Sequence, residues 1–474
     1  MAEAQLEALG AWYLEAFPAV RQELGLPFGG FGPRDAAELE RRRSQAKAWA
    51  TEIGAGPGVR LARRALRQAD DQEPASIAEA VLTALVQSEL RDEDREAVWR
   101  AIPDALAGAV GPGQDPRALD QAARAAALAA GLLIAIDAKP EESDDGEPKA
   151  KAFMALEHYV RLLDAARETA SHGETMGPHA YHELMWDELG SYIVPKELAE
   201  AALLRLDAEL LEVARLGREI APGRDIAEII EDMGEDCPEG PQELMAAYED
   251  AQAEVLGAVG GDFPAVPSPE WRPGPAHLHG LLPLTAYVPG DARSPGRMLV
   301  FAGQGPMQVM HMRSRLVLTT AQGGVPGSHL LFSSAQARDV ASRIMLSPHV
   351  ALGWSQYAAG YVAQRLERPK VQLLQALDAA QRAARAFADV ALHAGLADER
   401  RILDLLGRPQ GLPEEFRQAE LAAIWRQPLL GAAPFWLEQA IGEEVRRRVA
   451  GGESPAAAHG RILQRGALPE EVGA

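Results

Sequence analysis

The chain of 474 residues carries 69 acidic against 47 basic side chains, which gives a formal net charge of −22. Such an excess of negative charge disfavours unaided binding to nucleic acid or to anionic lipid, so neither is predicted as a partner. Cys237 is the single cysteine and cannot form an internal disulfide, and the first residues show no basic and apolar leader pattern, so a cytoplasmic protein is predicted.

The N-terminal part of the sequence predicts amphipathic helices. Residues 4–106 show helical periodicity that is interrupted at the Gly- and Pro-rich stretches 27–33 and 54–58. A further helix is predicted over 119–138. It contains the longest apolar run, 125–136, which is too short to cross a bilayer, so no membrane span is expected.

A charged segment at residues 139–150 has almost no apolar side chains and is typical of an exposed linker. The predicted organisation is therefore a helical region at 1–138, an acidic linker at 139–150 and a second helical region at 151–474. Both regions are expected to pack into one compact unit. Helices are predicted next over 153–168, 181–189 and 196–220, with two more within 222–259.

The only predicted β-structure follows a stretch rich in proline and glycine. These residues, between 260 and 280, exclude a regular element there, and 281–288 and 297–301 are then predicted to form short strands. Helices return over 307–321, 369–394 and 416–449, the last with an interruption near Gly431. The predicted fold class is mainly α, with a small β-hairpin or sheet beside a cleft.

Four stretches of the second half follow one pattern in order and spacing: Gln-Gly-Gly-Val-Pro-Gly-Ser-His at 322–329, Leu-Gly-Trp-Ser-Gln-Tyr at 352–357, and the runs 382–393 and 459–469. In these stretches the chain resembles the bacterial domain-of-unknown-function family 885. That family is similar to helical zinc metallopeptidases of the gluzincin type, with hallmark runs His-Glu-x-x-Pro-Gly-His-His and Glu-Gly-Trp-Ala-x-Tyr. The resemblance therefore implies a large helical metallopeptidase-like fold.

The same resemblance implies that the zinc site is degenerate. The first metal histidine falls on Gln322, the glutamate base on Gly323, the first of the paired histidines on Ser328, and the glutamate that opens the second run on Leu352. A catalytic zinc needs about three protein ligands, and hydrolysis needs a base for the zinc-bound water. His329 alone cannot supply them, so no metal or other cofactor is predicted and the chain should not be an active zinc peptidase.

The residues that remain give a set of candidate site positions. Gln322, Ser328 and Trp354 are candidate ligand-binding residues, and His329, Tyr357, Asp389 and His393 are candidate acid–base or positioning groups. Gln322 and His329 share a face if one helix continues through Pro326–Gly327. The alternative for His329 is a buried histidine satisfied by a backbone carbonyl or by Ser328.

Asp389 and His393 lie four residues apart on one helix, so the carboxylate can orient the imidazole. The alternative is an intrahelical pair that fixes this helix against its neighbours.

A histidine cluster at 172–183 offers a relocated metal site as a further alternative. His179 and His182 share a helix face, and Glu183, Glu174 or His172 could complete the ligands. Against it, Pro178 indicates a helix start, and histidines in an exposed first turn need no metal.

The leading functional hypothesis is a pseudoenzyme that keeps the peptidase scaffold as a binding, regulatory or structural protein. Its expected partner is a peptide-like or small-molecule ligand, or a related protein. The alternative is a metal-independent enzyme that acts on a small amide or peptide-like metabolite in the old cleft.

Overall fold

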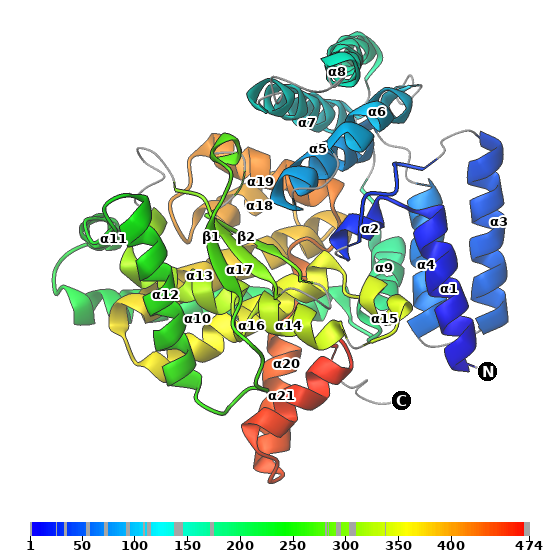
Figure 1. Ribbon diagram of the computed structural model, residues 1–474. Coiled ribbons are helices and arrows are strands. Elements are labelled where there is room, and N and C mark those ends of the chain that lie inside the picture. Colours follow the sequence, from blue (N-terminus) through cyan, green and yellow to red (C-terminus); the bar gives the residue numbers. More distant parts are fainter. Residues whose placement is uncertain are drawn as a thin grey trace. The chain divides into compact units, whose positions relative to one another are not determined.

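The structure is a computed structural model of the 474-residue chain. It describes residues 2–24, 26–32, 36–53, 57–70, 74–91, 95–107, 110, 115–136, 146–170, 175–279, 282, 284–290, 295–302, 310–336 and 338–468. Helices dominate the described residues and one small sheet accompanies them, which confirms the predicted mainly α fold class (Figure 1).

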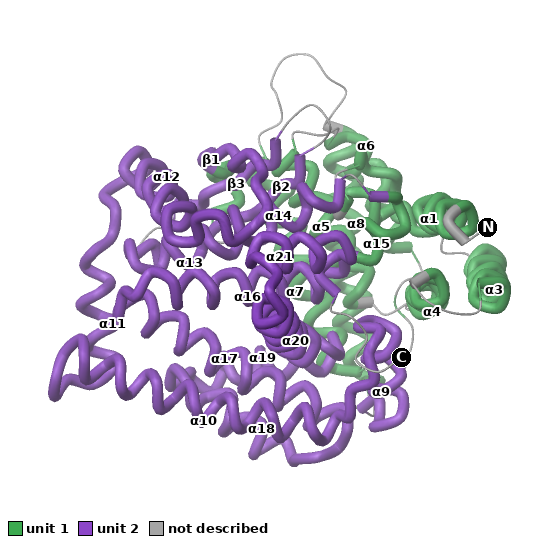
Figure 2. Tube along the Cα trace, turned by 90° about the horizontal axis from the view of Figure 1, so that it is seen from below, with its two compact units in different colours: residues 1–174, 274–281, 339–345 green, residues 175–273, 282–338, 346–474 purple. Residues whose placement is uncertain are grey.

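The chain forms two compact units, coloured separately in Figure 2. Unit 1 holds Met1–Glu174, Gly274–Leu281 and Asp339–Met345. Its elements are α1 (Ala2–Ala16), α2 (Val20–Glu23), α3 (Ala36–Ile53), α4 (Pro57–Asp70), α5 (Pro74–Arg91), α6 (Arg95–Leu106), α7 (Pro116–Ala135), α8 (Gly146–Ala166), the 3-10 turns Arg167–Thr169 and Ala276–Leu278, and α15 (Val340–Ile344).

Unit 2 holds Thr175–Pro273, Leu282–Arg338 and Leu346–Ala474. Its elements are α9 (Pro178–Leu189), α10 (Pro195–Ile220), α11 (Ile226–Gly234), α12 (Gly240–Val259), β1 (Glu270–Pro273), β2 (Thr285–Val288), β3 (Arg297–Val300), α13 (Arg313–Gly323), α14 (Ser328–Ala335), α16 (Pro348–Leu366), α17 (Pro369–His393), α18 (Glu399–Gly407), α19 (Glu414–Arg426), α20 (Ala432–Ala450) and α21 (Pro455–Gln464).

Helix α7 is the one described helix that is long and apolar enough to cross a membrane by length and composition. Its buried face, which includes Leu119, Ala126 and Leu133, packs against α5 and α8 within unit 1. A core helix meets the same criteria, so this feature is weak evidence for a membrane. The predicted linker at 139–150 falls largely on residues 137–145, outside the described part, and the predicted boundary stays a prediction.

The core of unit 2 is centred on α17. Small and apolar side chains occupy nearly every face of this helix, from Val371 through Ala383 to Val390, so neighbouring helices can approach it on all sides. It packs along α10 and also contacts α13, α16, α18, α19 and α20. Local signals fix where its neighbours begin: the Ser347 hydroxyl accepts the Val350 N–H at 3.3 Å, and Pro348 occupies the first turn of α16.

The small sheet has the strand order β1-β3-β2, with β1 parallel and β2 antiparallel to β3. The strands β2 and β3 fall within the two predicted strands. The prediction that residues 260–280 contain no regular element is wrong, because Glu270 pairs with Arg297 and Pro273 with Val300 at the edge of the sheet. An edge strand tolerates prolines because one side of it needs no ladder hydrogen bonds.

Candidate functional site

Two of the positions at which the resemblance implies zinc-site residues line one cavity of unit 2. Gln322 in the last turn of α13 and Leu352 in the first turns of α16 face a space of about 350 Å³. The helices α16 and α17, which are joined by residues 367–368, both contribute to the lining of this space. The other lining residues are Gln356, Asp378, Gln381, Arg382, Arg385, Gln410, Leu412, Phe416 and Glu420. We call this space the first cavity.

The charged side chains of the first cavity are compensated in pairs. Arg385 makes two hydrogen bonds of 2.5 Å to Glu420, and the Asp378 carboxylate accepts from Arg315. Arg382 donates to Glu438 of α20 at 3.1 and 3.3 Å. A paired guanidinium retains little free charge for a ligand, so the cavity favours a neutral polar molecule.

Two glutamines carry the unsatisfied hydrogen-bonding capacity of the first cavity. Gln356 and Gln381 are each 8% exposed. Within the part of the chain that the structure describes, no hydrogen-bond partner reaches the buried Oε1 of either residue. An unpartnered buried acceptor costs roughly 1–3 kcal/mol, which a ligand that donates hydrogen bonds can recover.

The space beside Gly323 is filled by the sheet. A Cβ on Gly323 would collide with the Cε of Met298, a buried residue of β3. A glutamate at this position therefore requires the methionine to move. Met298 therefore occupies the space that a side chain at position 323 would need.

The two helices on either side of Val325–Pro326 are separate. Helix α13 ends at Gly323 and α14 begins at Ser328, so the conjecture of one continuous helix is wrong. The indole of Trp354 donates to the carbonyl oxygens of Pro326 and Gly327 at 2.9 and 3.1 Å. On the other side, Gln252 donates to the Val325 carbonyl at 3.1 Å. Trp354 therefore holds the connecting loop and does not line the first cavity.

Ser328 and His329 lie in the first turn of α14, turned toward different neighbours. The hydroxyl of Ser328 is 2.8 Å from that of Ser355. His329 Nε2 lies 2.7 Å from the Pro267 carbonyl, which fixes the proton on that nitrogen, and Nδ1 can accept from the Tyr287 hydroxyl at 3.2 Å. Burial lowers the pKa of His329, so the neutral ring fits this arrangement.

Tyr357 belongs to a separate buried pair. Its hydroxyl is 2.8 Å from Nε2 of His459, whose Nδ1 lies 2.6 Å from the Asp262 carbonyl. The histidine therefore donates a hydrogen bond to the Asp262 carbonyl and accepts one from the Tyr357 hydroxyl. Burial lowers the pKa of His459 to about 4 and raises the pKa of Tyr357 well above its usual value. The proton consequently stays on the tyrosine near neutral pH.

Asp389 and His393 contact different backbone groups. The fully buried Asp389 carboxylate accepts the Tyr181 hydroxyl at 2.9 Å and the backbone N–H groups of Leu429, Gly431 and Ala432 at 3.1, 2.8 and 3.0 Å. Burial raises the pKa of Asp389, and the charge of His393 and the three N–H groups oppose that rise. These contacts fix the start of α20, because the carboxylate satisfies N–H groups that a helix leaves free.

His393 Nε2 donates to the Ile424 carbonyl at 3.0 Å, and its ring stacks on Tyr181 at 5.4 Å. Its Nδ1 is buried, and the described atoms provide no hydrogen-bond partner for it. The four candidate acid–base residues thus occupy three separate neighbourhoods: His329 beside Tyr287, Tyr357 beside His459, and Asp389 with His393 beside Tyr181.

The alternative metal residues lie on α9. His179 and Glu183 are largely exposed and 3.7 Å apart, while His182 packs edge-on against Tyr192. His172 and Glu174 lie outside the described residues. Across the described ranges, no three His, Cys, Asp or Glu side chains are close enough to share a metal ion.

The zinc ion that the resemblance implies does not fit the residues present. At the expected positions stand an amide (Gln322), a residue without a side chain (Gly323), a hydroxyl (Ser328) and an alkyl group (Leu352). Zinc prefers imidazole, thiolate or carboxylate ligands. No chemical step through zinc is therefore derived for this chain.

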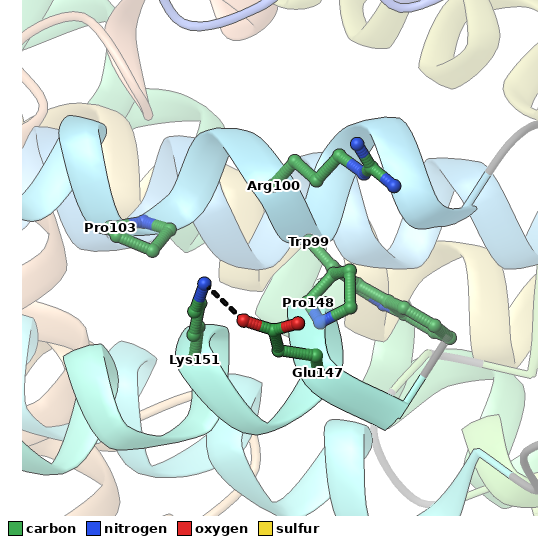
Figure 3. A pocket seen from close by; sticks show the side chains of 6 residues that line it. All are labelled: Trp99, Arg100, Pro103, Glu147, Pro148 and Lys151. Atoms are coloured by element: carbon green, nitrogen blue, oxygen red, sulfur yellow. Dashed lines mark ion pairs between the residues drawn. The ribbon is translucent and has the colours of Figure 1, made fainter. Parts of the chain in front are cut away.

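A further pocket of about 400 Å³ lies in unit 1 between α6 and α8 (Figure 3). Its rim carries an ion pair between Lys151 and Glu147, one turn apart and 2.6 Å from each other. Both side chains are mostly exposed, which is ordinary for a solvated helix surface. The pocket contains none of the predicted site residues.

Gln356, Gln381 and Arg382 of the first cavity, and His459 beside Tyr357, were not singled out as site residues from the sequence. The available signal was a glutamine on an otherwise apolar helix face, as at Gln381 among the alanines of α17. Their joint position depends on tertiary packing of α13, α16, α17 and α19, which local patterns do not encode.

The sequence profile of a bacterial protein family of unknown function, DUF885, matches residues 77–428. The fold is similar to that of a candidate lipoprotein of unknown function from Shewanella oneidensis, with a TM-score of 0.74 and 12% identity over 99% of this chain and 98% of that one. It is also similar to a candidate lipoprotein from Colwellia psychrerythraea, with a TM-score of 0.69 and 15% identity over 98% and 97% of the two chains. No curated protein matches the sequence.

Proposed function

The chain belongs to the bacterial family of unknown function DUF885, and from that premise we propose that it is a metallopeptidase-like pseudoenzyme that binds a small neutral polar molecule. The ligand occupies the first cavity, where the zinc ligands and the base have been replaced. The observation that carries the proposal is the pair of buried amide oxygens of Gln356 and Gln381 beside Gln322 and Leu352. A ligand with amide or hydroxyl donors, such as a peptide-like or small-molecule partner, satisfies these oxygens once the glutamine side chains turn them toward the cavity.

The proposed loss of peptidase activity is inferred from the side chains at the expected zinc-ligand positions and from the packing of Met298 over Gly323. Restoring the activity needs ligands, a base and room for that base, because Met298 fills the adjacent space. The wild-type protein should therefore purify without stoichiometric zinc and should not hydrolyse peptides in a chelator-sensitive way. One zinc per chain together with such hydrolysis contradicts the proposal.

A restored variant sharpens the metal test. Gln322→His, Ser328→His and Leu352→Glu supply ligands, Gly323→Glu supplies the base and Met298→Ala provides room. Zinc content measured by elemental analysis should rise toward one ion per chain in this variant and stay near zero in Met298→Ala alone. If the restored variant folds and takes up no zinc, the assignment of these positions to the old metal site is wrong.

Ligand binding is tested by thermal unfolding of the full chain in the presence of simple amides, N-acetylated amino acids or neutral sugars. A bound compound raises the apparent stability according to its affinity. The double variant Gln356→Leu with Gln381→Leu should lose that response, while Gln418→Leu on the exposed face of α19 should keep it. An equal response in all three proteins contradicts binding in the first cavity.

The alternative of a metal-independent enzyme has weaker support from the geometry. Its acid–base residues lie in separate neighbourhoods, and the Tyr357–His459 pair keeps its proton on the tyrosine near neutral pH. A screen of the wild type against metabolites tests this alternative. An activity that is found there and is lost in both folded variants, His329→Ala and His393→Ala, would favour it.

A further inference from the structure

A second, larger cavity of about 470 Å³ lies in unit 2 between α10, α16, α17 and α20. Tyr357, Gly360 and Tyr361 of α16 form one wall, and Gln375 of α17 and Glu438 of α20 face it. We call this space the second cavity. It shares no lining residue with the first cavity and is not used in the proposed function.

Gly360 leaves a gap at a polar point of the second cavity. A Cβ at this position would lie 3.3 Å from Nε2 of Gln375 and 3.9 Å from Oε1 of Glu438. Glycine inside a helix costs roughly 0.5–1 kcal/mol relative to alanine. At Gly360 the missing side chain leaves an opening between an amide and a carboxylate.

The Gln375 amide has unused hydrogen-bonding capacity. The residue is 9% exposed, and its buried Oε1 has no hydrogen-bond partner among the residues that the structure describes. A half-turn of the amide about its last bond exchanges the oxygen and the nitrogen, since the two atoms occupy equivalent positions. Gln375 can thus present an acceptor to the gap beside Gly360.

Carboxylates outnumber guanidinium groups in the lining of the second cavity. Four carboxylates, those of Glu209, Glu212, Glu438 and Glu443, face it against the guanidinium groups of Arg205 and Arg446. Three of the four are paired with arginines: Glu209 with Arg205, Glu212 with Arg215 and Glu438 with Arg382. Glu443 forms no ion pair within the described part of the chain. Burial raises the pKa of Glu209, the charge of Arg205 opposes that rise, and the charge of Glu438 adds to it. The rings of Tyr357 and Tyr361 add faces that attract cations.

We propose that the second cavity binds an organic cation through a primary ammonium group seated at Gly360, where Gln375 and Glu438 accept its hydrogen bonds. The ammonium donates to the Gln375 oxygen after the amide has made this half-turn, and it competes with Arg382 for the Glu438 carboxylate. Its alkyl part lies along the Tyr357 and Tyr361 rings.

The test is isothermal titration of the full chain with 1,4-diaminobutane, with 1,4-butanediol as the uncharged probe of the same length. The diamine should bind and the diol should not bind at the same concentration. Gln375→Leu and Gly360→Leu should each weaken diamine binding at least tenfold. The first removes the acceptor and the second fills the gap.

A matched control tests whether the loss is specific to this site. Gln418→Leu changes the same residue type on the exposed face of α19 and lines neither cavity, so it should bind the diamine as the wild type does. Circular dichroism and urea unfolding verify that each variant is folded. The proposal is overturned if the wild type does not bind the diamine, if the diol binds equally well, or if folded Gln375→Leu and Gly360→Leu both retain wild-type affinity.

Discussion

Burial strongly lowers the pKa of His459, which couples the stability of the fold to pH. It is fully buried, donates to the Asp262 carbonyl and accepts from Tyr357, so both of its nitrogens are used only in the neutral form. Burial lowers its folded pKa to about 4, below the value of about 6.5 expected in the unfolded chain. As the pH falls, the folded state therefore takes up this proton at a lower pH than the unfolded state does.

The sign of the effect follows from proton uptake. The stabilisation is fully present above about pH 6.5 and is lost as pH falls toward 4, because the unfolded chain binds the proton first. Between pH 6.5 and 4.5 the wild type should lose about 2 kcal/mol more unfolding free energy than His459→Gln. Urea unfolding at pH 6.5, 5.5 and 4.5 measures this difference. Equal losses in the two proteins would show that His459 does not titrate in this way.

Single residues of the candidate site were partly predictable. The sequence predicts Gln322 and Leu352 at expected zinc-site positions, because the matched runs define the register of the resemblance, and this stays a prediction. The filling of the space over Gly323 by Met298 could not be predicted, because these residues meet only through packing of β3 against α13. Proximity between residues on different elements is a tertiary property.

At the scale of elements, the contact between α16 and α20 depends on a glycine. A Cβ on Gly353 would lie 2.6 Å from Cβ of Leu437 and 3.3 Å from the Pro434 carbonyl. Neither group can rotate away, because one is a Cβ and the other is backbone. Gly353→Ala should lower the free energy of unfolding by about 1–3 kcal/mol, as overpacked positions do.

The control is Gly257→Ala, in the helix α12, where a Cβ meets no described atom within 4 Å. That change should raise the free energy of unfolding by about 0.5–1 kcal/mol, because alanine restricts the unfolded chain. Urea unfolding of both variants at one pH gives the comparison. Similar effects in both variants would contradict the close approach of α16 and α20.

Helices with a strong helical periodicity of apolar residues were predicted better than elements that form through pairing with distant parts of the chain. The predictions at 196–220 and 369–394 fall on α10 and α17, which are long and have apolar residues at helical spacing. The strand β1 was not predicted, because its pairing with β3 spans residues 270 to 297 and its sequence ends in proline. The helix predicted to start at 307 begins at Arg313 in the structure, because the backbone of Met312 is not helical, and residues 303–309 lie outside the described part.

At the scale of the whole molecule, the fold extends over nearly the full length of two solved structures at 12% and 15% identity. Such identities establish the fold and leave the activity open. The predicted cytoplasmic location stays a prediction, and those two proteins are described as candidate lipoproteins. Cell fractionation with an antibody against the chain tests it.

The two cavities of unit 2 are linked through one ion pair. Arg382 lines the first cavity and donates to Glu438, which lines the second. Both side chains are largely buried, so their attraction is only weakly screened. An ammonium group in the second cavity competes with Arg382 for the same carboxylate. Occupation of either cavity should then alter the affinity of the other by the same factor.

Removing Arg382 tests this link without a known ligand for the first cavity. Arg382→Gln frees Glu438 for the ammonium, so 1,4-diaminobutane should bind about tenfold more tightly, a typical coupling of about 1.4 kcal/mol. Arg385→Gln is the matched control, because Arg385 lines the same cavity but pairs with Glu420. Isothermal titration of both variants gives the ratio of affinities. An unchanged affinity in folded Arg382→Gln, or an equal gain in Arg385→Gln, would show that the Arg382–Glu438 pair does not couple the two cavities.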